Sequence, residues 1–534
     1  MSLADRIAHA RRTSSESHPS LPVTSMAEWI ASRADDPRRF LSFLDDDGQR
    51  IDLSYAEFAG LTSTCAAALL DSGLQPGDRI ATLATNHWHT VVYYFAAWRA
   101  GLCVVPVNLG EDDDRIRFIL THGQVKWAYV AADTEPRLAR IAPDLPRSTE
   151  LIASPESLPP SSASVEADAL IVYTSGTTGQ PKGVLLSQAN LLEDARAIAE
   201  WQRIEADTRM MCVLPIHHVN GTVVTLVTPF HAGASVVLVR KFHATRFFEI
   251  VEREQVHVVS VVPTLLQFLN QMAEPPVSTP LKRVICGAGP LTVTVACTFE
   301  ARFGIRIIHG YGLSETTCYS CYLPLELSDE EHASWMGDSG YPSIGVALPV
   351  NEMQIHDPTG RPLSDGERGE IVIRGHNVMR EYYANPQANE NAFTFGWFRS
   401  GDEGFAMTDA SGRRFFFITG RIKELIIRGG VNLAPLEIDE VLAKAPGVKA
   451  GISVGFENDW YGEEVGAYVV MREDAEHDAE SILQHCREHL PFSKCPKVVV
   501  FGEQIPVTST GKYQRMKVAH LFKQWKETQF RASP

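Results

Sequence analysis

The sequence predicts an α/β protein in which a large N-terminal region is built on a largely parallel sheet and a small α+β domain follows. Its 534 residues exceed what one compact hydrophobic core normally organises. Over most of the chain, apolar residues with helical spacing alternate with strand-like runs, which is typical of βαβ units. The segment Gly420–Gly430 (GRIKELIIRGG) mixes glycine with charge, as expected of a junction, and a fresh helix–strand–strand–helix–strand pattern follows it.

The first alternating region begins with a helix at Tyr55–Leu70, where apolar residues recur at helical spacing. A turn then leads into a short strand at Arg79–Leu83. A second helix is predicted at Val91–Trp98, and Leu102–Val107 reads as a buried strand because it is apolar throughout. Strands that are separated by helices pair in parallel, so this order predicts a parallel sheet.

The rest of the N-terminal region contains a connection, a second alternating region and a β-rich part. Ile141–Val165 is rich in Pro, Ser and Ala, which indicates a surface connection. Alternation resumes over Ala169–Ile344. Strands divided by turns are then predicted around Ile355, at Glu370–Arg374 and at Phe415–Ile418.

Composition favours a cytoplasmic enzyme and argues against nucleic acid as a partner. Lys and Arg number 49 against 65 for Asp and Glu, so the formal charge is −16, and a field of this sign repels phosphate backbones. No apolar run reaches the roughly 18–20 residues of a membrane helix, and the first residues lack the apolar segment of a secretory signal. The nine cysteines, an odd number, favour reduced thiols over a disulfide framework.

The stretch Ile171–Leu186 (IVYTSGTTGQPKGVLL) has the composition of a phosphate-binding loop between two strands. Its glycines free the backbone to turn N–H groups toward oxygen anions, its hydroxyls add donors, and Lys182 adds a positive charge. It is not a Walker loop, because Pro181 precedes the lysine and Gly183 replaces the Ser or Thr. The candidate nucleotide ligands of this stretch are Thr174, Ser175, Gly176, Thr177, Thr178, Gly179 and Lys182.

YTSGTTGQPKGV resembles the signature of the class I adenylate-forming superfamily, which includes acyl-CoA synthetases, adenylation domains and firefly-type luciferases. The chain is most similar to AMP-forming acyl-CoA ligases, and the resemblance covers nearly all of it. Six further segments resemble motifs of that superfamily, in the same order: LPIHHVNG (214–221), CGAGPLT (286–292), HGYGLSET (309–316), SGDE (400–403), GRIKELIIRGGVN (420–432) and PVTSTGKYQR (506–515).

The resemblance implies a fold, a division into domains and a reaction. The fold would be a large N-terminal domain of stacked αβαβα sheets with a β-rich subdomain, and a small, mobile α+β C-terminal domain. Residues 1–422 would bind ATP and the acid, and residues 423–534 would carry the catalytic lysine. The acid would react with ATP and Mg²⁺ to give acyl-AMP and pyrophosphate, and the thiol of CoA would then displace AMP.

By the same resemblance, Tyr311 and the backbone at residues 287–288 would enclose the adenine. Asp402 would accept the ribose hydroxyls, with Arg421 beside it. Glu315 would ligate Mg²⁺, a cation that prefers oxygen ligands. The implied nucleotide ligands outside the phosphate loop are Gly287, Ala288, Tyr311, Gly312, Ser314, Asp402 and Arg421.

The remaining implied residues serve catalysis, domain movement and CoA. Lys512 would be the catalytic cation, because two anions meet when a carboxylate attacks a phosphate. His218 would line the acyl pocket beside the reacting carboxylate. Lys423 would be the hinge of the C-terminal domain, and Gly429 and Gly430 would let the pantetheine arm of CoA pass close to the chain.

The acid is expected to be uncharged and hydrophobic. Thr222–Phe230 and Val259–Leu269 are largely apolar, and LPIHHVNG lacks the Asp that would pair the ammonium of an amino acid. Two alternatives stay open. The enzyme could pass its acyl-AMP to a separate thioesterifying or carrier protein, or the chain could be a regulatory ATP-binding protein without catalysis. A homodimer is also open.

Overall fold

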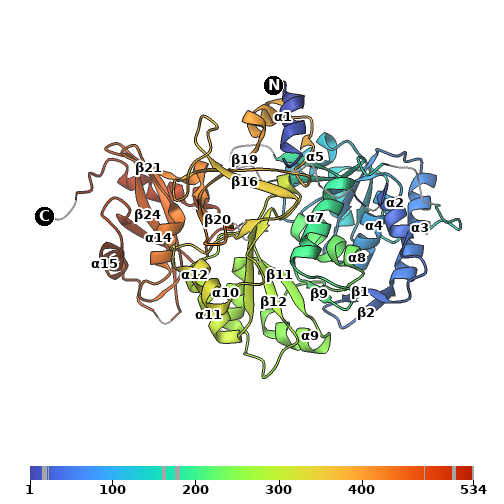
Figure 1. The fold of residues 1–534 in the computed structure, drawn as a ribbon, viewed down its shortest axis with the longest axis horizontal. Coiled ribbons are helices and arrows are strands. Elements are labelled where there is room, and N and C mark those ends of the chain that lie inside the picture. Colours follow the sequence, from blue (N-terminus) through green and yellow to red (C-terminus); the bar gives the residue numbers. More distant parts are fainter. Residues whose placement is uncertain are drawn as a thin grey trace.

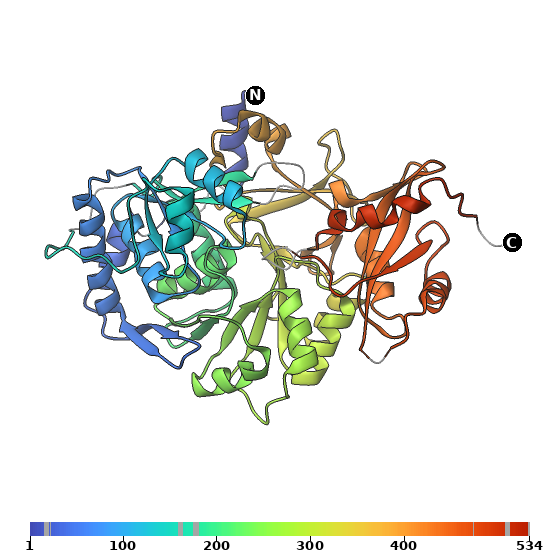
Figure 2. The same ribbon diagram turned by 180° about the vertical axis from the view of Figure 1, so that it is seen from behind.

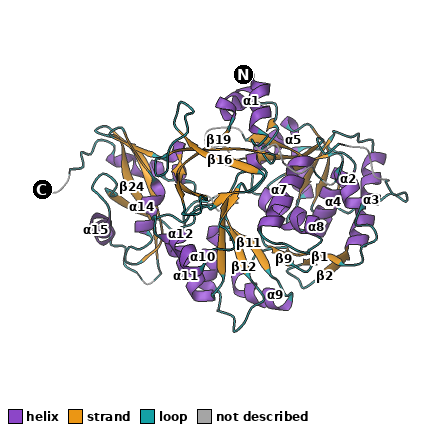
Figure 3. Cartoon of the chain, in the orientation of Figure 1, coloured by secondary structure: helices purple, strands orange, loops and turns teal. Residues whose placement is uncertain are grey.

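The computed structural model describes residues 1–14, 21, 23–158, 164–174, 181–473, 475–507 and 513–531. Two large sheets, a smaller antiparallel sheet and a C-terminal sheet organise these residues (Figures 1 and 3). None of the described helices is long and apolar enough to cross a membrane.

The seven-stranded sheet carries the strand that precedes the phosphate loop. Its first five strands in chain order pair in parallel as predicted, whereas β7–β8 and β8–β18 pair antiparallel. Its spatial order is β18 (Glu381–Tyr382), β8 (Lys182–Ser187), β7 (Asp168–Thr174), β4 (Cys103–Pro106), β3 (Arg79–Leu83), β5 (Val125–Val130) and β6 (Arg147–Ser148).

The nine-stranded sheet is parallel from β13 to β1 and antiparallel at both edges. Its order is β15 (Val346–Ala347), β14 (Cys321–Tyr322), β13 (Arg306–Tyr311), β12 (Arg283–Cys286), β11 (Val258–Val261), β9 (Arg209–Cys212), β10 (Ser235–Val239), β1 (Arg39–Leu44) and β2 (Arg50–Ser54).

Apolar helices fill the space between these two sheets, and one continuous core joins both. Helix α7 begins directly after Ser187. The Ser187 hydroxyl accepts a hydrogen bond from the backbone amide of Asn190, as expected of an N-cap. The helices of this layer are α4 (Trp88–Arg99), α7 (Gln188–Trp201), the π-helical η1 (Asn220–Val227) and α8 (Thr228–Ala232). Helix α3 (Tyr55–Asp71) packs against α4, while α5 (Asp113–His122) and α6 (Glu135–Ile141) cover the opposite face of the seven-stranded sheet.

The remaining helices surround these layers. They are α1 (Leu3–Ala10), α2 (Met26–Ala31), α9 (Phe247–Arg253), α10 (Pro263–Met272), α11 (Val293–Phe303), α12 (Asp329–Gly337) and α13 (Pro386–Ala392). The β-rich part is a four-stranded antiparallel sheet of β16 (Asn351–His356), β17 (Gly369–Gly375), β19 (Phe398–Thr408) and β20 (Arg414–Arg421).

Residues after the junction form their own sheet around two separate cores. The predicted order is confirmed as α14 (Pro435–Leu442), β23 (Val448–Asn458), β24 (Gly462–Met471), α15 (Ala479–His489) and β25 (Val498–Phe501). A short hairpin, β21 (Ile426–Arg428) and β22 (Val431–Leu433), precedes α14 and was not predicted. In Figures 1 and 2 this unit lies at the end of the molecule opposite to α3.

One carboxylate joins the C-terminal unit to the rest of the molecule. Glu440 of α14 accepts hydrogen bonds from the backbone amides of Val293 and Thr294, each at 3.1 Å, and from the Thr294 hydroxyl at 2.8 Å. These amides begin helix α11, and the first amides of a helix have no partner within the helix. The contact therefore stabilises the observed arrangement of the two parts.

Candidate active site

An ion pair and a tyrosine from three strands meet at the junction. Tyr311 ends β13, Asp402 lies on β19 and Arg421 ends β20. The Tyr311 hydroxyl donates to Asp402 Oδ2 at 2.6 Å, and Arg421 Nε lies 3.2 Å from Asp402 Oδ1. Burial raises the pKa of Tyr311 well above its ordinary value, so its hydroxyl stays a donor. The charge of Asp402 raises the pKa of Arg421.

Asp402 has an atom that no described residue satisfies. Its Oδ1 is buried and makes no hydrogen bond among the described residues, although the guanidinium of Arg421 is close. Buried polar atoms are normally hydrogen-bonded, so a carboxylate oxygen that has an ion-pair neighbour but no hydrogen bond, in a residue that lines the cavity, can accept from a further donor. A ribose hydroxyl has the required chemistry, and the residue thus fits the predicted nucleotide.

The backbone around Tyr311 is packed so closely that glycine is required. A Cβ at Gly312 would lie 1.7 Å from the carbonyl oxygen of Cys318. On the facing strand end, Ala288 has φ +66°, a left-handed conformation that is disfavoured for a residue with a side chain. The predicted adenine-binding segments lie at the ends of β12 and β13, which are adjacent parallel strands. Ser314 lies in the 3₁₀ turn after β13.

Glu315 and Lys182 are connected by a residue that the sequence analysis missed. The Tyr382 hydroxyl donates to Glu315 Oε1 at 2.8 Å, and Lys182 Nζ lies 4.7 Å from the centre of the Tyr382 ring. All three side chains are at least partly buried. Strand β18, which carries Tyr382, pairs with β8, which begins at Lys182, so sheet pairing places Tyr382 near Lys182. Glu315 lies in neither strand, and its backbone carbonyl accepts a hydrogen bond from the backbone amide of Met379, just before β18.

Glu315 also fits the predicted Mg²⁺. Its Oε1 accepts from Tyr382, which orients the carboxylate, and no group of three metal-ligating side chains is found among the described residues. Mg²⁺ usually binds one or two protein carboxylates together with substrate phosphates and water. Glu315 would hold the ion, which on binding neutralises phosphate charge.

Tyr311, Asp402 and Arg421 line a cavity of about 350 Å³ between the two parts of the molecule, whereas Glu315, Tyr382 and Lys182 are not among its lining residues. The C-terminal segment that follows Lys512 forms one wall of it. The described residues that line it are Arg115, Ala288, Gly289, Pro290, His309, Gly310, Tyr311, Gly312, Leu313, Ile344, Asp402, Ile418, Gly420, Arg421, Glu424, Pro435, Leu436, Tyr513, Gln514, Arg515, Met516 and Lys517.

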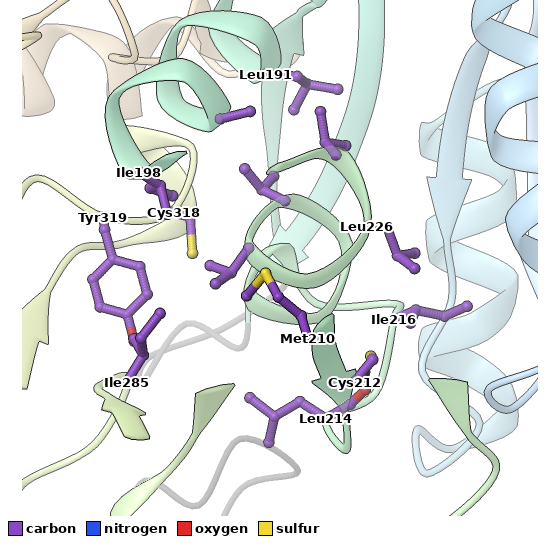
Figure 4. Packing of buried hydrophobic residues seen from close by; sticks show 14 of the residues in the cluster. Leu191, Ile198, Met210, Cys212, Leu214, Ile216, Leu226, Ile285, Cys318 and Tyr319 are labelled. Carbon is purple, nitrogen blue, oxygen red and sulfur yellow. Dashed lines mark hydrogen bonds between the residues drawn. The ribbon is translucent and has the colours of Figure 1, made fainter. Parts of the chain in front are cut away.

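The segment that resembles an acyl pocket contributes a polar cluster. Asn220 Nδ2 donates to the Tyr319 hydroxyl at 3.2 Å, and the Ser260 hydroxyl donates to Asn220 Oδ1 at 2.7 Å. A Cβ at Gly287 would lie 2.5 Å from the Tyr319 hydroxyl, so this ring fills the space beside the adenine segment. Figure 4 shows Tyr319 beside Ile285 and the π-helix η1 among buried apolar side chains. His218 is half-buried just before η1.

The predicted hinge and CoA-side residues do not line the cavity. Lys423 is exposed in the 3₁₀ turn Ile422–Glu424. Gly429 and Gly430 form the tip of the β21–β22 hairpin with φ of +57° and +82°, values that favour glycine. The apolar side chains of Ile427 and Val431, which belong to the same hairpin, are exposed.

Several predicted residues lie outside the described residues. They are the catalytic candidate Lys512 and the loop residues Ser175, Gly176, Thr177, Thr178 and Gly179. Their immediate neighbours are described: Thr174 ends β7, Lys182 begins β8, and Tyr513 lines the cavity.

Comparison with known families agrees with this geometry. The family model of the AMP-binding enzyme matches residues 28–383, and that of the AMP-binding enzyme C-terminal domain matches residues 437–512. The chain belongs to the AMP-binding enzyme family. Like other AMP-binding enzymes of the CoA ligase type, it is an AMP-forming acid–thiol ligase that uses ATP, Mg²⁺ and CoA. The predicted superfamily and enzyme class are thereby confirmed.

Individual AMP-binding enzymes similar to this chain include a sulfoacetate–CoA ligase from Cupriavidus necator, 35% identical over 87% of this chain and 92% of that protein. An oxalate–CoA ligase from Arabidopsis thaliana is 31% identical over 94% and 98%. The crystal structure of ATP-bound MatB from Rhodopseudomonas palustris superposes with a TM-score of 0.84 at 26% identity, covering 94% of this chain and 99% of that one. The predicted fold class is thus confirmed.

Proposed function

We propose that this ligase activates a compact carboxylic acid with ATP and transfers the acyl group of the resulting acyl-AMP to CoA. The observation that carries the proposal is the cavity, because residues from separate motifs converge on it. Tyr311 and Asp402 come from the large domain, whereas Tyr513 and Lys517 come from the C-terminal domain. Such a cavity can enclose a nucleotide only while the two domains are docked.

Lys512 is proposed as the catalytic cation. The next residue in the chain, Tyr513, lines the nucleotide cavity, which supports an approach of Lys512 from the same side. The TM-score is 0.84 with ATP-bound MatB and 0.73 with apo MatB, so the whole chain is more similar to the nucleotide-bound form. A positioned cation lowers the repulsion between the carboxylate of the acid and the polyphosphate.

The expectation of a hydrophobic acid is not supported by the packing. It rests on two apolar stretches, and in these Val223, Val224 and Val259 are completely buried in the core that joins the two sheets. Their apolar character follows from that packing, since buried strands and helices are apolar whatever the substrate is. The apolar character of these three residues therefore does not identify the acid.

The size and polarity of the acid are better argued from Tyr319. Its ring is buried against Gly287, and its hydroxyl bonds to Asn220 within the acyl-pocket segment. A bulky side chain at this position shortens the space for an acyl chain, and the amide and hydroxyls favour a substrate with hydrogen-bonding groups. The proposed substrates are accordingly short acids with polar substituents.

A screen of acids tests this proposal. Pyrophosphate release would be measured with short hydroxy and keto acids, linear fatty acids of increasing length, and aromatic acids. Tyr319→Ala is expected to raise kcat/KM for longer acids by about tenfold for each methylene accommodated, relative to the short ones. Tyr319→Phe keeps the ring and should keep the length limit. A parent enzyme that prefers long fatty acids, or an unchanged length profile in Tyr319→Ala, would contradict the proposal.

Two measurements separate the remaining alternatives. Formation of an acyl-CoA from free CoA distinguishes a ligase from an enzyme that passes acyl-AMP to a carrier or partner protein. Lys512→Ala should lower acid-dependent pyrophosphate release by about 10²–10³-fold, and an unchanged rate would refute its role as the catalytic cation. A parent protein that releases no pyrophosphate with any acid would favour a regulatory ATP-binding protein. The hinge at Lys423, the CoA-side role of Gly429 and Gly430, the division at residues 422 and 423, a cytoplasmic location and a homodimer stay predictions.

A further inference from the structure

Arg115 lines the nucleotide cavity, although it belongs to none of the sequence motifs quoted above. Arg115 lies in the first turn of α5, which follows strand β4. Strand β4 pairs in parallel with β7, the strand that ends at Thr174. The carboxyl ends of adjacent parallel strands lie at the same edge of a sheet, and ligands of α/β proteins bind at that edge.

The guanidinium of Arg115 is only partly engaged by the protein. Its Nε lies 3.0 Å from Glu111 Oε2 as an ion pair, and the buried Nε and Nη2 atoms both make no hydrogen bond among the described residues, although the whole side chain is 33% exposed. The other carboxylates nearby are occupied: Asp113 pairs with two arginines of α6, and Asp114 pairs with Arg117. A buried guanidinium donor without an acceptor indicates a ligand that supplies one.

The charges of the cavity suggest what that ligand is. The guanidinium of Arg421 faces Asp402, and Arg515 is paired with the buried Asp439. Arg115 and Lys517 line the same cavity from opposite domains. Since Asp402 and Asp439 already have arginine partners, the positive charges of Arg115 and Lys517 are not needed to balance these two carboxylates. A planar guanidinium matches two phosphate oxygens at once, which makes arginine well suited to a polyphosphate.

We infer that Arg115 binds the β- and γ-phosphates of ATP, and so the pyrophosphate that leaves when the acyl-adenylate forms. The inference rests on the proposed placement of ATP in this cavity. Arg115 would hold the leaving group in line with the attacking carboxylate and neutralise part of its charge. Glu111 would keep the guanidinium oriented before ATP arrives.

Calorimetric binding of ATP and AMP, without acid or CoA, tests the inference. AMP lacks the two phosphates, so Arg115→Ala should weaken ATP binding by about tenfold to a hundredfold and change AMP binding less than about twofold. Arg115→Lys keeps the charge but loses the paired donors, and an intermediate loss is expected. Arg117→Ala, an exposed arginine on the same helix, is the matched control and should leave both affinities unchanged.

Two outcomes would overturn the inference. Equal weakening of ATP and AMP would place Arg115 at the adenosine or at the domain contact, and unchanged ATP binding would reduce it to a structural residue. Thermal melting without nucleotide shows whether Arg115→Ala folds like the parent, and Arg115→Lys serves if it does not. Because no acid is present, a failure here is separate from a failure of the proposed acid specificity.

Discussion

Tyr382→Phe is the sharpest probe of the metal side of this site. The substitution removes one hydroxyl, which donates to Glu315 Oε1 at 2.8 Å in a buried position, and keeps the ring that faces Lys182. A hydrogen bond to a charged group contributes about 1.5–3 kcal/mol, which corresponds to about tenfold to a hundredfold. Residues that orient a metal ligand have effects of about the same size on metal affinity.

The assay is acid-dependent pyrophosphate release measured over a range of Mg²⁺ concentrations at saturating acid. Tyr382→Phe should raise the Mg²⁺ concentration for half-maximal rate by about tenfold or more, and added Mg²⁺ should restore part of the rate. The neighbouring Tyr383→Phe is the control. The Tyr383 hydroxyl accepts a hydrogen bond from Arg79 Nη2 at 2.9 Å. Identical Mg²⁺ dependence in the two variants would refute the role given to Tyr382.

Three further substitutions follow from buried charges. Asp402→Ala should raise KM for ATP by about tenfold to a hundredfold in the same assay, and an unchanged KM would remove it from the ribose site. Burial raises the pKa of Asp194 to about 8 from 3.8, so the native state holds a proton that the unfolded state releases. Stability should therefore fall by about 1.4 kcal/mol per pH unit from about pH 4 to about pH 8, and Asp194→Asn should flatten this slope in urea titrations. Arg515→Ala leaves the buried Asp439 unpaired and should destabilise the C-terminal domain by about 3–5 kcal/mol, whereas Arg487→Ala on an exposed helix face should change the denaturation midpoint little.

Much of the fold could be predicted because the relevant signals are local. The helical spacing at Tyr55–Leu70 and the apolar run at Leu102–Val107 correspond to α3 and β4 within a few residues. The order of elements after the junction was also predicted correctly, since each element has its own periodicity. The β21–β22 hairpin was missed because three-residue strands around two glycines have no periodicity to detect.

The candidate site was only partly accessible from sequence. Tyr311 and Asp402 could be named from motifs, but their 2.6 Å hydrogen bond joins residues 91 positions apart. Tyr382 stands in no quoted motif and reaches Glu315 across 67 positions, where a hydrogen bond from the Met379 backbone amide to the Glu315 carbonyl joins the two segments. The apolar stretches Thr222–Phe230 and Val259–Leu269 do not identify the acid by themselves, because an apolar residue looks the same in the core and in a substrate pocket.

The chain's residue pattern alone predicts an anion-binding loop, from a run of glycines, hydroxyls and a lysine between two strands, and the resemblance of its motifs implied the enzyme class. It also set the order of helices and strands. Folding decided which distant side chains meet: the partner of Glu315, the ring that closes on Gly287, and the arginine of α5 at the nucleotide cavity. The physical reason is that secondary structure depends mainly on residues close in sequence. A binding site depends on sheet pairing and domain docking, and the sequence of one segment does not show which distant segment it will contact.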